Sequence, residues 1–517
     1  MLNATEEQPK QRRLGIEAIL TAIAILLTVG MFSRAIVDVD NGYDPGWYHL
    51  PFAARIWGIL PESMFIGDEK WFEPRFAGFP LLAHFLQGFF WRLTGRMQST
   101  NLVGCLAITG YFFFLRKYLR VPFYLSTIAL LTIPLVQAHA SSSYVDLLGN
   151  VGTSILVMMT YCFYKDSLFP SRQQLFMAFL GAAIAVNTKT QLQPLVVVIL
   201  LFTGSRLAWL IWRNGIKQPA KIALVTLLAS LVIFATPVKN TVLYGNPLYP
   251  IKIEIAGIVL NHKLNPDAFE EGNRQINWVT SVLGINAPLI WSAAQWDGNP
   301  VLSRRGGFLN GYVVFNLLLL VGFWIRESIL NRSLPKSERH NEARLAVLTA
   351  IAMSIVPLNF PQSHELRYFM YWMITLVSLN LHLVSLPKNR QLLGGWLRPK
   401  YLSLACALFL TIIVVRTEAY FFRPTFISEA EYVDFGVKQS YLDQIEPNEK
   451  VCIVARHMGE NISEAPVASL KYIFAYSSYF HPEIGYDYLI KTAFDPDSCG
   501  DLRIIPNDLP PEAWNVD

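Results

Sequence analysis

The chain has 517 residues, of which 53% are hydrophobic and only 16% are charged. Soluble proteins carry about 25% charged residues, so this composition excludes a soluble protein with an ordinary polar surface. The hydrophobic residues gather in almost uncharged runs of roughly 16–22 residues, the length that crosses the ~30 Å hydrocarbon core of a bilayer. The net charge of +5 therefore indicates basic cytoplasmic loops and not a nucleic-acid partner.

Eleven stretches are long and apolar enough to cross a membrane, which predicts an all-α polytopic membrane protein. In chain order they are residues 15–37, 99–115, 122–138, 147–164, 173–187, 192–212, 221–238, 307–325, 344–360, 368–386 and 401–417. The first follows two arginines, is too long for a typical signal peptide and lacks a small-residue cleavage site. We expect it to remain as the first helix, with the N-terminus in the cytoplasm.

The apolar stretch 76–93 is ambiguous because Pro80, His84 and Gln87 interrupt it. If it does not cross the membrane, every later basic cluster falls on the cytoplasmic side, and if it does cross, all of them move outside. The positive-inside rule favours the first alternative. The stretch is therefore predicted to be a re-entrant or interfacial element on the outer face.

This topology predicts a multi-pass protein of the inner (plasma) membrane with long outer loops at 38–98 and 239–306. Residues 1–420 would form the transmembrane domain, and residues 421–517 an extracytoplasmic C-terminal domain of ordinary polarity. The run from Val451 to Ala455 predicts a buried strand there, within a small α/β appendage. Cys452 and Cys499 would share an oxidising compartment, where a disulfide and two free thiols are both open alternatives.

The first outer loop opens with three carboxylates, Asp38, Asp40 and Asp44, directly after the first helix. Pro51 then suits the first position of a helix, and apolar residues recur at helical spacing over residues 52–60. This pattern predicts an amphipathic helix that lies in the membrane interface and holds an acidic cluster at headgroup depth. The alternative is a solvated turn after a helix end.

The residues Tyr48-His49-Leu50-Pro51, which begin four positions after Asp44, resemble the GT-C superfamily of membrane glycosyltransferases. The similarity is to the branch related to protein O-mannosyltransferases and aminoarabinose transferases. Three further segments resemble that branch: the Asn…Gly-Asn-Pro…Pro pattern between Lys239 and Pro250, the Asn-Thr-Lys-Thr segment at Lys189, and the pair Arg367-Tyr368. The resemblance covers most of residues 15–420 in the order of its elements, but not the tail.

The resemblance implies an inverting glycosyltransferase that moves a sugar from a polyprenyl-phosphate-linked donor to an acceptor hydroxyl or amine. The reaction would take place on the extracytoplasmic face, where nucleotide sugars are not available, and the acceptor would be a glycan, a lipid or a protein. The protein would then interact with the lipid bilayer as well as with donor and acceptor, and no nucleic-acid partner is expected. No metal is favoured for the chemistry, although a divalent ion stays an alternative.

In such a reaction a carboxylate takes the proton of the acceptor while the lipid phosphate leaves with its charge. Asp44 is the expected catalytic base because it is in register with the Tyr-His-Leu-Pro residues, and Asp40 is the second choice. Asp146 could join it, or could instead cap the next helix.

Outward basic residues are expected to stabilise the departing phosphate. Lys189 and Arg367 are the first candidates, and Arg75 and Lys239 are alternatives. The remaining candidates for substrate binding are Tyr48, His49, Glu73 and Tyr368.

Two other functions compete with this one. A transporter or lipid-glycan flippase would predict charged residues deep inside the spans and repeated halves, and neither pattern is evident in the sequence. A non-catalytic membrane scaffold would make the acidic loop dispensable.

Overall fold

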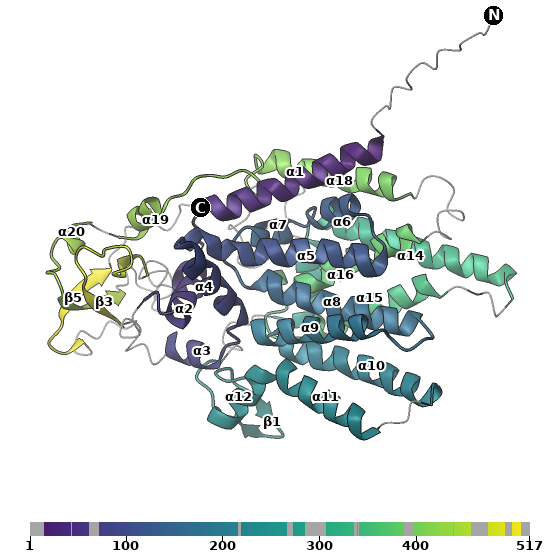
Figure 1. Ribbon diagram of the computed structural model, residues 1–517, viewed down its shortest axis with the longest axis horizontal. Coiled ribbons are helices and arrows are strands. Elements are labelled where there is room, and N and C mark those ends of the chain that lie inside the picture. Colours follow the sequence, from purple (N-terminus) through teal and green to yellow (C-terminus); the bar gives the residue numbers. More distant parts are fainter. Residues whose placement is uncertain are drawn as a thin grey trace, which may run out of the picture.

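The computed structural model describes residues 15–42, 44–60, 72–215, 219–265, 272–284, 307–335, 339, 341–386, 398–437, 439–455, 474–491 and 499–507. Long helices make up most of this part of the chain and run side by side along the long axis of the molecule (Figure 1). A small sheet formed by the tail lies at one end of this helical body (Figure 1).

The helical body contains α1 (Ile16–Val37), α5 (Leu102–Leu119), α6 (Phe123–Leu130), α7 (Pro134–Ala140), α8 (Asp146–Lys165), α9 (Arg172–Thr188), α10 (Leu192–Arg213), α11 (Pro219–Ile233), α12 (Ala235–Tyr244), α14 (Asn310–Ser333), α15 (Glu342–Asn359), α16 (Met370–Ser385) and α18 (Pro399–Arg416). Among the described residues, eight helices are long and apolar enough to cross a membrane, and two bent pairs bring the number to ten. Helix α9, of 17 residues, occupies the remaining predicted stretch. The chain is a multi-pass membrane protein, and each predicted span corresponds to a helix or a bent pair.

Two of the predicted spans are broken. Helices α6 and α7 are bent by 100° within the stretch 122–138, and α11 and α12 by 73° within the stretch 221–238. Pro134 begins α7, and Pro237 lies in the first turn of α12. Because proline has no N–H, neither residue can donate to the carbonyl four positions earlier, and each helix ends before its proline.

Helices α8 and α16 form the centre of the body. Every residue of α16 is buried, and α8 packs closely on α9 through two facing glycines. A Cβ atom added to Gly181 of α9 would lie 2.6 Å from the carbonyl oxygen of Gly152 in α8. Small residues allow such close backbone contact between helices in membranes. This contact holds the end of α9 against the start of α8, where the charged residues of the candidate site lie.

Short elements connect α1 to α5: the π-helical turn η1 (Pro45–His49), α2 (Leu50–Ile56), α3 (Phe72–Gly78), α4 (Leu82–Thr94) and the 3₁₀ turn η3 (Met97–Asn101). The ambiguous stretch 76–93 forms the end of α3 and most of α4. Helix α4 has 13 residues and so spans only about 20 Å, which is too short to cross a bilayer.

The apolar side of α2 packs against protein. Phe52 is fully buried and contacts the rings of Phe72 and Phe76 in α3. It belongs to an apolar cluster that also includes Val451 and Tyr486 of the tail. Protein therefore covers the apolar side of α2 at Phe52, and the expectation that the helix lies in the membrane interface stays a prediction.

The tail carries a three-stranded parallel sheet in the order β4-β3-β5, with β3 (Lys450–Ala455), β4 (Asp487–Lys491) and β5 (Arg503–Asn507). Strand β3 is the strand predicted from the sequence, and its Val451 is fully buried. Cys452 and Cys499 form a disulfide. The Trp91 indole of α4 donates a hydrogen bond to the Tyr479 hydroxyl at 3.3 Å, so the tail rests directly on the connecting helices.

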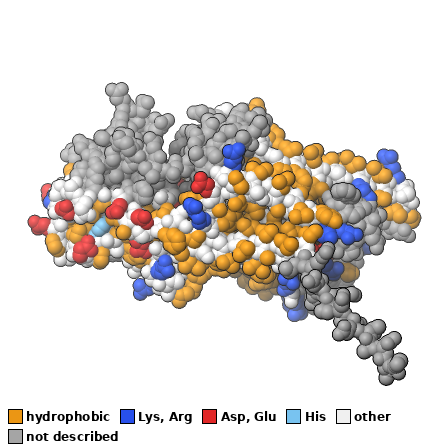
Figure 2. Space-filling model, turned by 90° about the horizontal axis from the view of Figure 1, so that it is seen from above, with side chains coloured by type: hydrophobic (Ala, Val, Ile, Leu, Met, Phe, Trp, Pro, Cys, Tyr) orange, Lys and Arg blue, Asp and Glu red, His pale blue; other side chains and the backbone are white. Residues whose placement is uncertain are grey.

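The smaller elements complete the described chain: β1 (Glu254–Ile255), β2 (Ile258–Val259), α13 (Arg274–Leu283), η7 (Leu366–Phe369), α19 (Glu429–Gly436), α20 (Gln439–Leu442) and η9 (Phe474–Tyr476). Figure 2 shows hydrophobic side chains over one face of the helical body, with acidic side chains gathered at the end that carries the tail. This distribution fits a body that lies in a membrane and an end that lies in water.

Candidate active site

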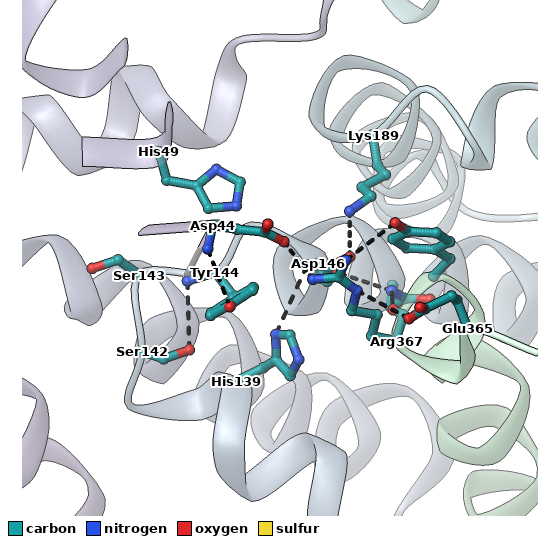
Figure 3. A network of polar contacts seen from close by, with 12 residues as sticks. Asp44, His49, His139, Ser142, Ser143, Tyr144, Asp146, Lys189, Glu365 and Arg367 are labelled. Atoms are coloured by element: carbon teal, nitrogen blue, oxygen red, sulfur yellow. Dashed lines mark hydrogen bonds and ion pairs between the residues drawn. The ribbon is translucent and has the colours of Figure 1, made fainter. Parts of the chain in front are cut away.

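A cluster of charged side chains lies buried where the helical body meets the connecting helices (Figure 3). Asp44 precedes η1, Asp146 begins α8, Lys189 follows α9, and Arg367 lies in η7. None of the four is more than 8% exposed. Because a buried charge is costly unless it is paired, the arrangement of these groups decides whether the site is stable.

The four charges form two ion pairs. Arg367 Nη1 donates to Asp44 Oδ2, and Lys189 Nζ donates to Asp146 Oδ1. Arg367 Nη2 also donates to the Tyr368 hydroxyl at 3.2 Å, and Lys189 Nζ lies 4.3 Å from the centre of the same ring. Tyr368 therefore links the two cations into one polar site.

Polar residues of the body hold the guanidinium in position. The side-chain amide of Asn150 in α8 donates to the backbone carbonyl of Arg367 at 3.1 Å and accepts from the backbone N–H of Tyr371 at 2.9 Å. Glu365 Oε2 lies 3.4 Å from Arg367 Nε. Arg367 is thus fixed through its backbone as well as through its side chain.

Asp146 does not cap its helix. Val145 occupies the N-cap position of α8, and its side chain makes no capping hydrogen bond. The Asp146 carboxylate instead pairs with Lys189 and lies 4.0 Å from Nδ1 of His139. Burial lowers the pKa of Lys189, and the contact with Asp146 opposes that shift. The expectation that Asp146 takes part in catalysis with Asp44 stays a prediction. The alternative that its side chain caps α8 does not agree with these contacts.

Tyr48 and His49 line the same region from η1. His49 Nδ1 lies 2.9 Å from Nε2 of His84 in α4, and its ring packs on Tyr48 with centroids 4.1 Å apart. Burial raises the pKa of Tyr48 well above its usual value, and the Asp44 charge adds to the shift. Burial also lowers the pKa of His49, and that of His84 to about 3. All three side chains are therefore neutral at pH 7.

The other two acids of the first loop have backbone partners. The Asp40 carboxylate accepts from the N–H of Ser143 at 2.7 Å and from that of Gly42 at 2.8 Å. The Asp38 carboxylate accepts from backbone N–H groups at Thr425 and the residue that follows it. These contacts tie the loop to two other segments of the chain, which is a structural role for both acids.

Three candidates from the sequence lie around α3. Glu73 pairs with Arg55 at 2.7 Å, and Lys239 Nζ donates to the carbonyl of Ala77 at 2.5 Å. The guanidinium of Arg75 lies 4.8 Å from the centre of the Trp47 ring. Glu73 and Lys239 therefore have partners on α2 and α3 instead of joining the two ion pairs.

Four residues at the site were not predicted from the sequence: His84, His139, Tyr144 and Asn150. The Tyr144 hydroxyl lies 3.4 Å from the backbone N–H of Asp44, and the other three contact the cluster or its partners. A usable signal was present, because His84 and His139 are ionisable residues inside apolar stretches, where such residues are usually functional. Within the described ranges no group of three or more His, Cys, Asp or Glu side chains is placed to hold a metal ion.

No protein-family model and no curated protein matches this chain. Among solved structures, the chain is similar to the crystal structure of ArnT from Cupriavidus metallidurans bound to undecaprenyl phosphate, with 11% identity and a TM-score of 0.47 over 92% of this chain and 90% of that one. The values for the apo structure of the same protein are 12% and 0.48, over 91% and 89% of the two chains. ArnT is an aminoarabinose transferase.

Proposed function

We propose that this protein is an inverting glycosyltransferase that uses a polyprenyl-phosphate-linked sugar on the extracytoplasmic face of the membrane. The observation that carries the proposal is the buried cluster of two carboxylates and two cations at one end of a membrane helix bundle. A reaction of this kind needs a proton acceptor for the incoming nucleophile and cations for the departing lipid phosphate.

The two cations suit a phosphate. The Arg367 guanidinium can bind two phosphate oxygens through its planar fork, and the Lys189 ammonium adds a compact charge. The phosphate gains negative charge as its bond to the sugar breaks. Both cations therefore stabilise the transition state more than the bound donor, which is the condition for faster transfer.

We assign the proton transfer to Asp44. Its carboxylate takes the proton of an acceptor hydroxyl or amine while the acceptor atom bonds to the anomeric carbon. The bond from that carbon to the phosphate oxygen breaks, and its electron pair stays with the polyprenyl phosphate. Attack from the side opposite the phosphate inverts the anomeric configuration. Asp44 comes from the loop and is 7% exposed, whereas Asp146 is fully buried in the body, so Asp44 is the more accessible of the two.

The ion pairs imply an exchange of partners when the donor binds. Without donor, Asp44 neutralises Arg367, and a carboxylate held by a guanidinium is a poor proton acceptor. A lipid phosphate that binds Arg367 would replace Asp44 as its partner and release the carboxylate. Asp146 would keep Lys189 in place, since that pair lies deeper.

Two features support the extracytoplasmic location. The tail contains the Cys452–Cys499 disulfide, and disulfides persist in oxidising compartments. Lys165, Arg172 and Arg213 lie at the ends of α8, α9 and α10 that are remote from the candidate site. Basic residues gather on the cytoplasmic side of membrane proteins, so the candidate site would face the other side.

The test is release of polyprenyl phosphate from labelled donors by the purified protein in the presence of membrane extract as acceptor. Donors carrying a hexose, a pentose and an aminopentose should be compared, and the anomeric configuration of the product determined. Turnover with inversion is expected for at least one donor. Absence of turnover with all of them, together with solute counterflow in proteoliposomes, would favour the transporter alternative.

A further inference from the structure

Helix α12 carries exposed apolar side chains directly after a membrane span. Val238, Val242 and Leu243 lie on one side of this helix and are all exposed, Val242 to 77%. Helix α11, which precedes α12 by a single residue, belongs to the span and also exposes aliphatic side chains. These are Leu224, Val225, Leu227, Leu228, Leu231 and Val232. The apolar surface of α12 therefore continues a surface that faces lipid.

A fixed bend turns α12 away from the direction of α11. The two helices meet at 73°, so α12 lies close to the membrane plane where α11 crosses along the membrane normal. The side chain of Asn187, in α9, holds this bend. Its Oδ1 accepts from the backbone N–H of Thr236 at 3.1 Å, and its Nδ2 donates to the carbonyl of Ile233 at 3.0 Å. These are backbone groups that the break leaves without helical partners.

The length of α11 fits an α12 that lies within the membrane surface. Helix α11 has 15 residues and spans only about 22 Å, roughly 8 Å less than the hydrocarbon core. Amphipathic helices at a membrane surface sink about 5–10 Å into the boundary between headgroups and acyl chains. Asn187 lies two residues before Lys189, so α12 lies at the end of the helical body that carries the candidate site.

The polar side of α12 faces α3. Lys239 Nζ donates to the carbonyl of Ala77 at 2.5 Å. The side-chain amide of Asn240 donates to the carbonyls of Gly78 at 2.8 Å and of Tyr249 at 3.1 Å. Helix α12 thus binds protein with one side, and its apolar side is exposed in the part of the chain that the structure describes.

The hairpin of β1 and β2 adds a second apolar surface. Its strands are antiparallel, with Ile255 opposite Ile258 and Glu254 opposite Val259. Because side chains alternate along a strand, the two isoleucines share one face of the hairpin and Glu254 lies on the other. Ile255 is 58% exposed and Ile258 is 66% exposed. Water is an unfavourable environment for two large aliphatic side chains at the tip of a loop.

Buried hydrogen bonds fix the hairpin to the end of α12. Asn246 is fully buried, and its side-chain amide donates to the carbonyls of Ile251 at 2.9 Å and Asn261 at 2.7 Å. The side-chain amide of Asn261 in turn donates to the carbonyl of Tyr244 in α12 at 3.2 Å. Figure 1 shows β1 directly beside α12 at the edge of the helical body. Helix and hairpin therefore form one unit.

We propose that this unit, residues 235–264, is inserted in the membrane leaflet on the side of the candidate site, with the exposed side chains of α12 and the hairpin tip among the lipid acyl chains. The charges of the unit fit this partner. It contains three lysines and one acid, Glu254, which lies on the opposite face of the hairpin from the two isoleucines. Lysine side chains at this depth reach lipid phosphates with their ammonium groups. The contact with lipid does not depend on which reaction the protein catalyses.

The test is the membrane depth of spin labels on single introduced cysteines in the full-length protein, reconstituted in vesicles of phosphatidylethanolamine and phosphatidylglycerol. Val242→Cys and Ile258→Cys report on the helix and the hairpin. Leu224→Cys on α11 is the reference for lipid, and Asp443→Cys, exposed in the tail, is the reference for water. Glu254→Cys is the matched control on the opposite face of the hairpin. The three free cysteines of the chain are buried, and the unsubstituted protein gives their background labelling.

Collision rates are measured with oxygen, which concentrates in the hydrocarbon core, and with a water-soluble nickel chelate. The labels at Val242 and Ile258 should resemble the one at Leu224, with nickel collision rates several-fold below that at Asp443. The label at Glu254 should collide with nickel more often than the label at Ile258. A nickel rate at Val242 or Ile258 equal to that at Asp443 would place that element in water and overturn the proposal. Protection from both reagents would show that protein covers the surface, either another part of this chain or a second copy, and would overturn it as well.

Discussion

Removal of one charge from the buried ion pair between Asp146 and Lys189 should lower the free energy of unfolding far more than removal of a charge from a more exposed pair. The side chain of Asp146 is 0% exposed and that of Lys189 is 9% exposed. Asp146→Asn keeps the size of the side chain but leaves the ammonium buried without its carboxylate. Breaking a buried pair in this way costs about 3–5 kcal/mol.

The double variant Asp146→Asn/Lys189→Met removes both charges and should recover most of that loss, because a neutral pair carries no uncompensated charge. The two changes should therefore be strongly non-additive, with a coupling of at least about 2 kcal/mol. Glu73→Gln is the matched control, since the Glu73 side chain is 31% exposed in its pair with Arg55. We expect that change to cost at most about 1 kcal/mol.

Unfolding free energies can be measured by titration with a denaturing detergent in mixed micelles, with the wild type and the four variants in parallel: Asp146→Asn, Lys189→Met, the double variant and Glu73→Gln. If the losses of the two single variants simply add in the double variant, Asp146 and Lys189 do not stabilise each other. That result would show that paired charges do not hold the cluster together.

Three further predictions concern the catalytic base, the buried histidine pair and the tail. Asp44→Asn should lower kcat by roughly 10²–10⁴-fold, as expected for loss of a general base. Asp40→Asn should lower the stability of the protein and leave the turnover of the folded protein unchanged. Equal kcat values for the two variants would contradict the assignment of Asp44 as the base. Burial lowers the pKa of His84 from 6.5 to about 3, so the unfolded chain binds a proton at a pH where the folded protein does not. The contribution of neutral His84 to the free energy of unfolding is therefore complete above pH 6.5 and falls by about 1.4 kcal/mol for each pH unit toward pH 3. Between pH 7 and pH 5 the free energy of unfolding should decrease less in His84→Phe than in the wild type. Cys452→Ser should destabilise the tail by about 2–5 kcal/mol without changing the helical body, which proteolysis of the two regions can measure.

The sequence predicts the membrane spans well because a run of about 20 apolar residues almost without charge seldom occurs in a soluble fold. The bends between α6 and α7 and between α11 and α12 could have been read from Pro134 and Pro237, each of which removes a helical hydrogen bond. The burial of Phe52 could not be predicted in this way, because the apolar cluster that contains it includes residues of the tail, about 400 positions away in the sequence. The spacing of apolar residues predicts which side of a helix is buried, but not which part of the chain packs against that side.

Contacts between distant parts of the chain also decide the arrangement of the candidate site, and the sequence does not predict them. Asp40 and Asp44 lie in one loop, and the sequence offers only a register to rank them. What separates them in the structure is the N–H of Ser143, which donates to Asp40, and the guanidinium of Arg367, which donates to Asp44. Both partners lie more than 100 residues away. Pairings of this kind depend on the packing of helices and leave no local pattern.

In the proposed reaction, Arg367 and Lys189 bind the phosphate of a lipid donor, and this binding releases Asp44 from its ion pair with Arg367. An electron cryo-microscopy map of the protein with polyprenyl phosphate bound in a lipid nanodisc tests this most directly. We expect phosphate density within hydrogen-bond distance of both cations, with the Asp44 carboxylate separated from Arg367. Phosphate density elsewhere on the protein, with both ion pairs intact, would contradict it.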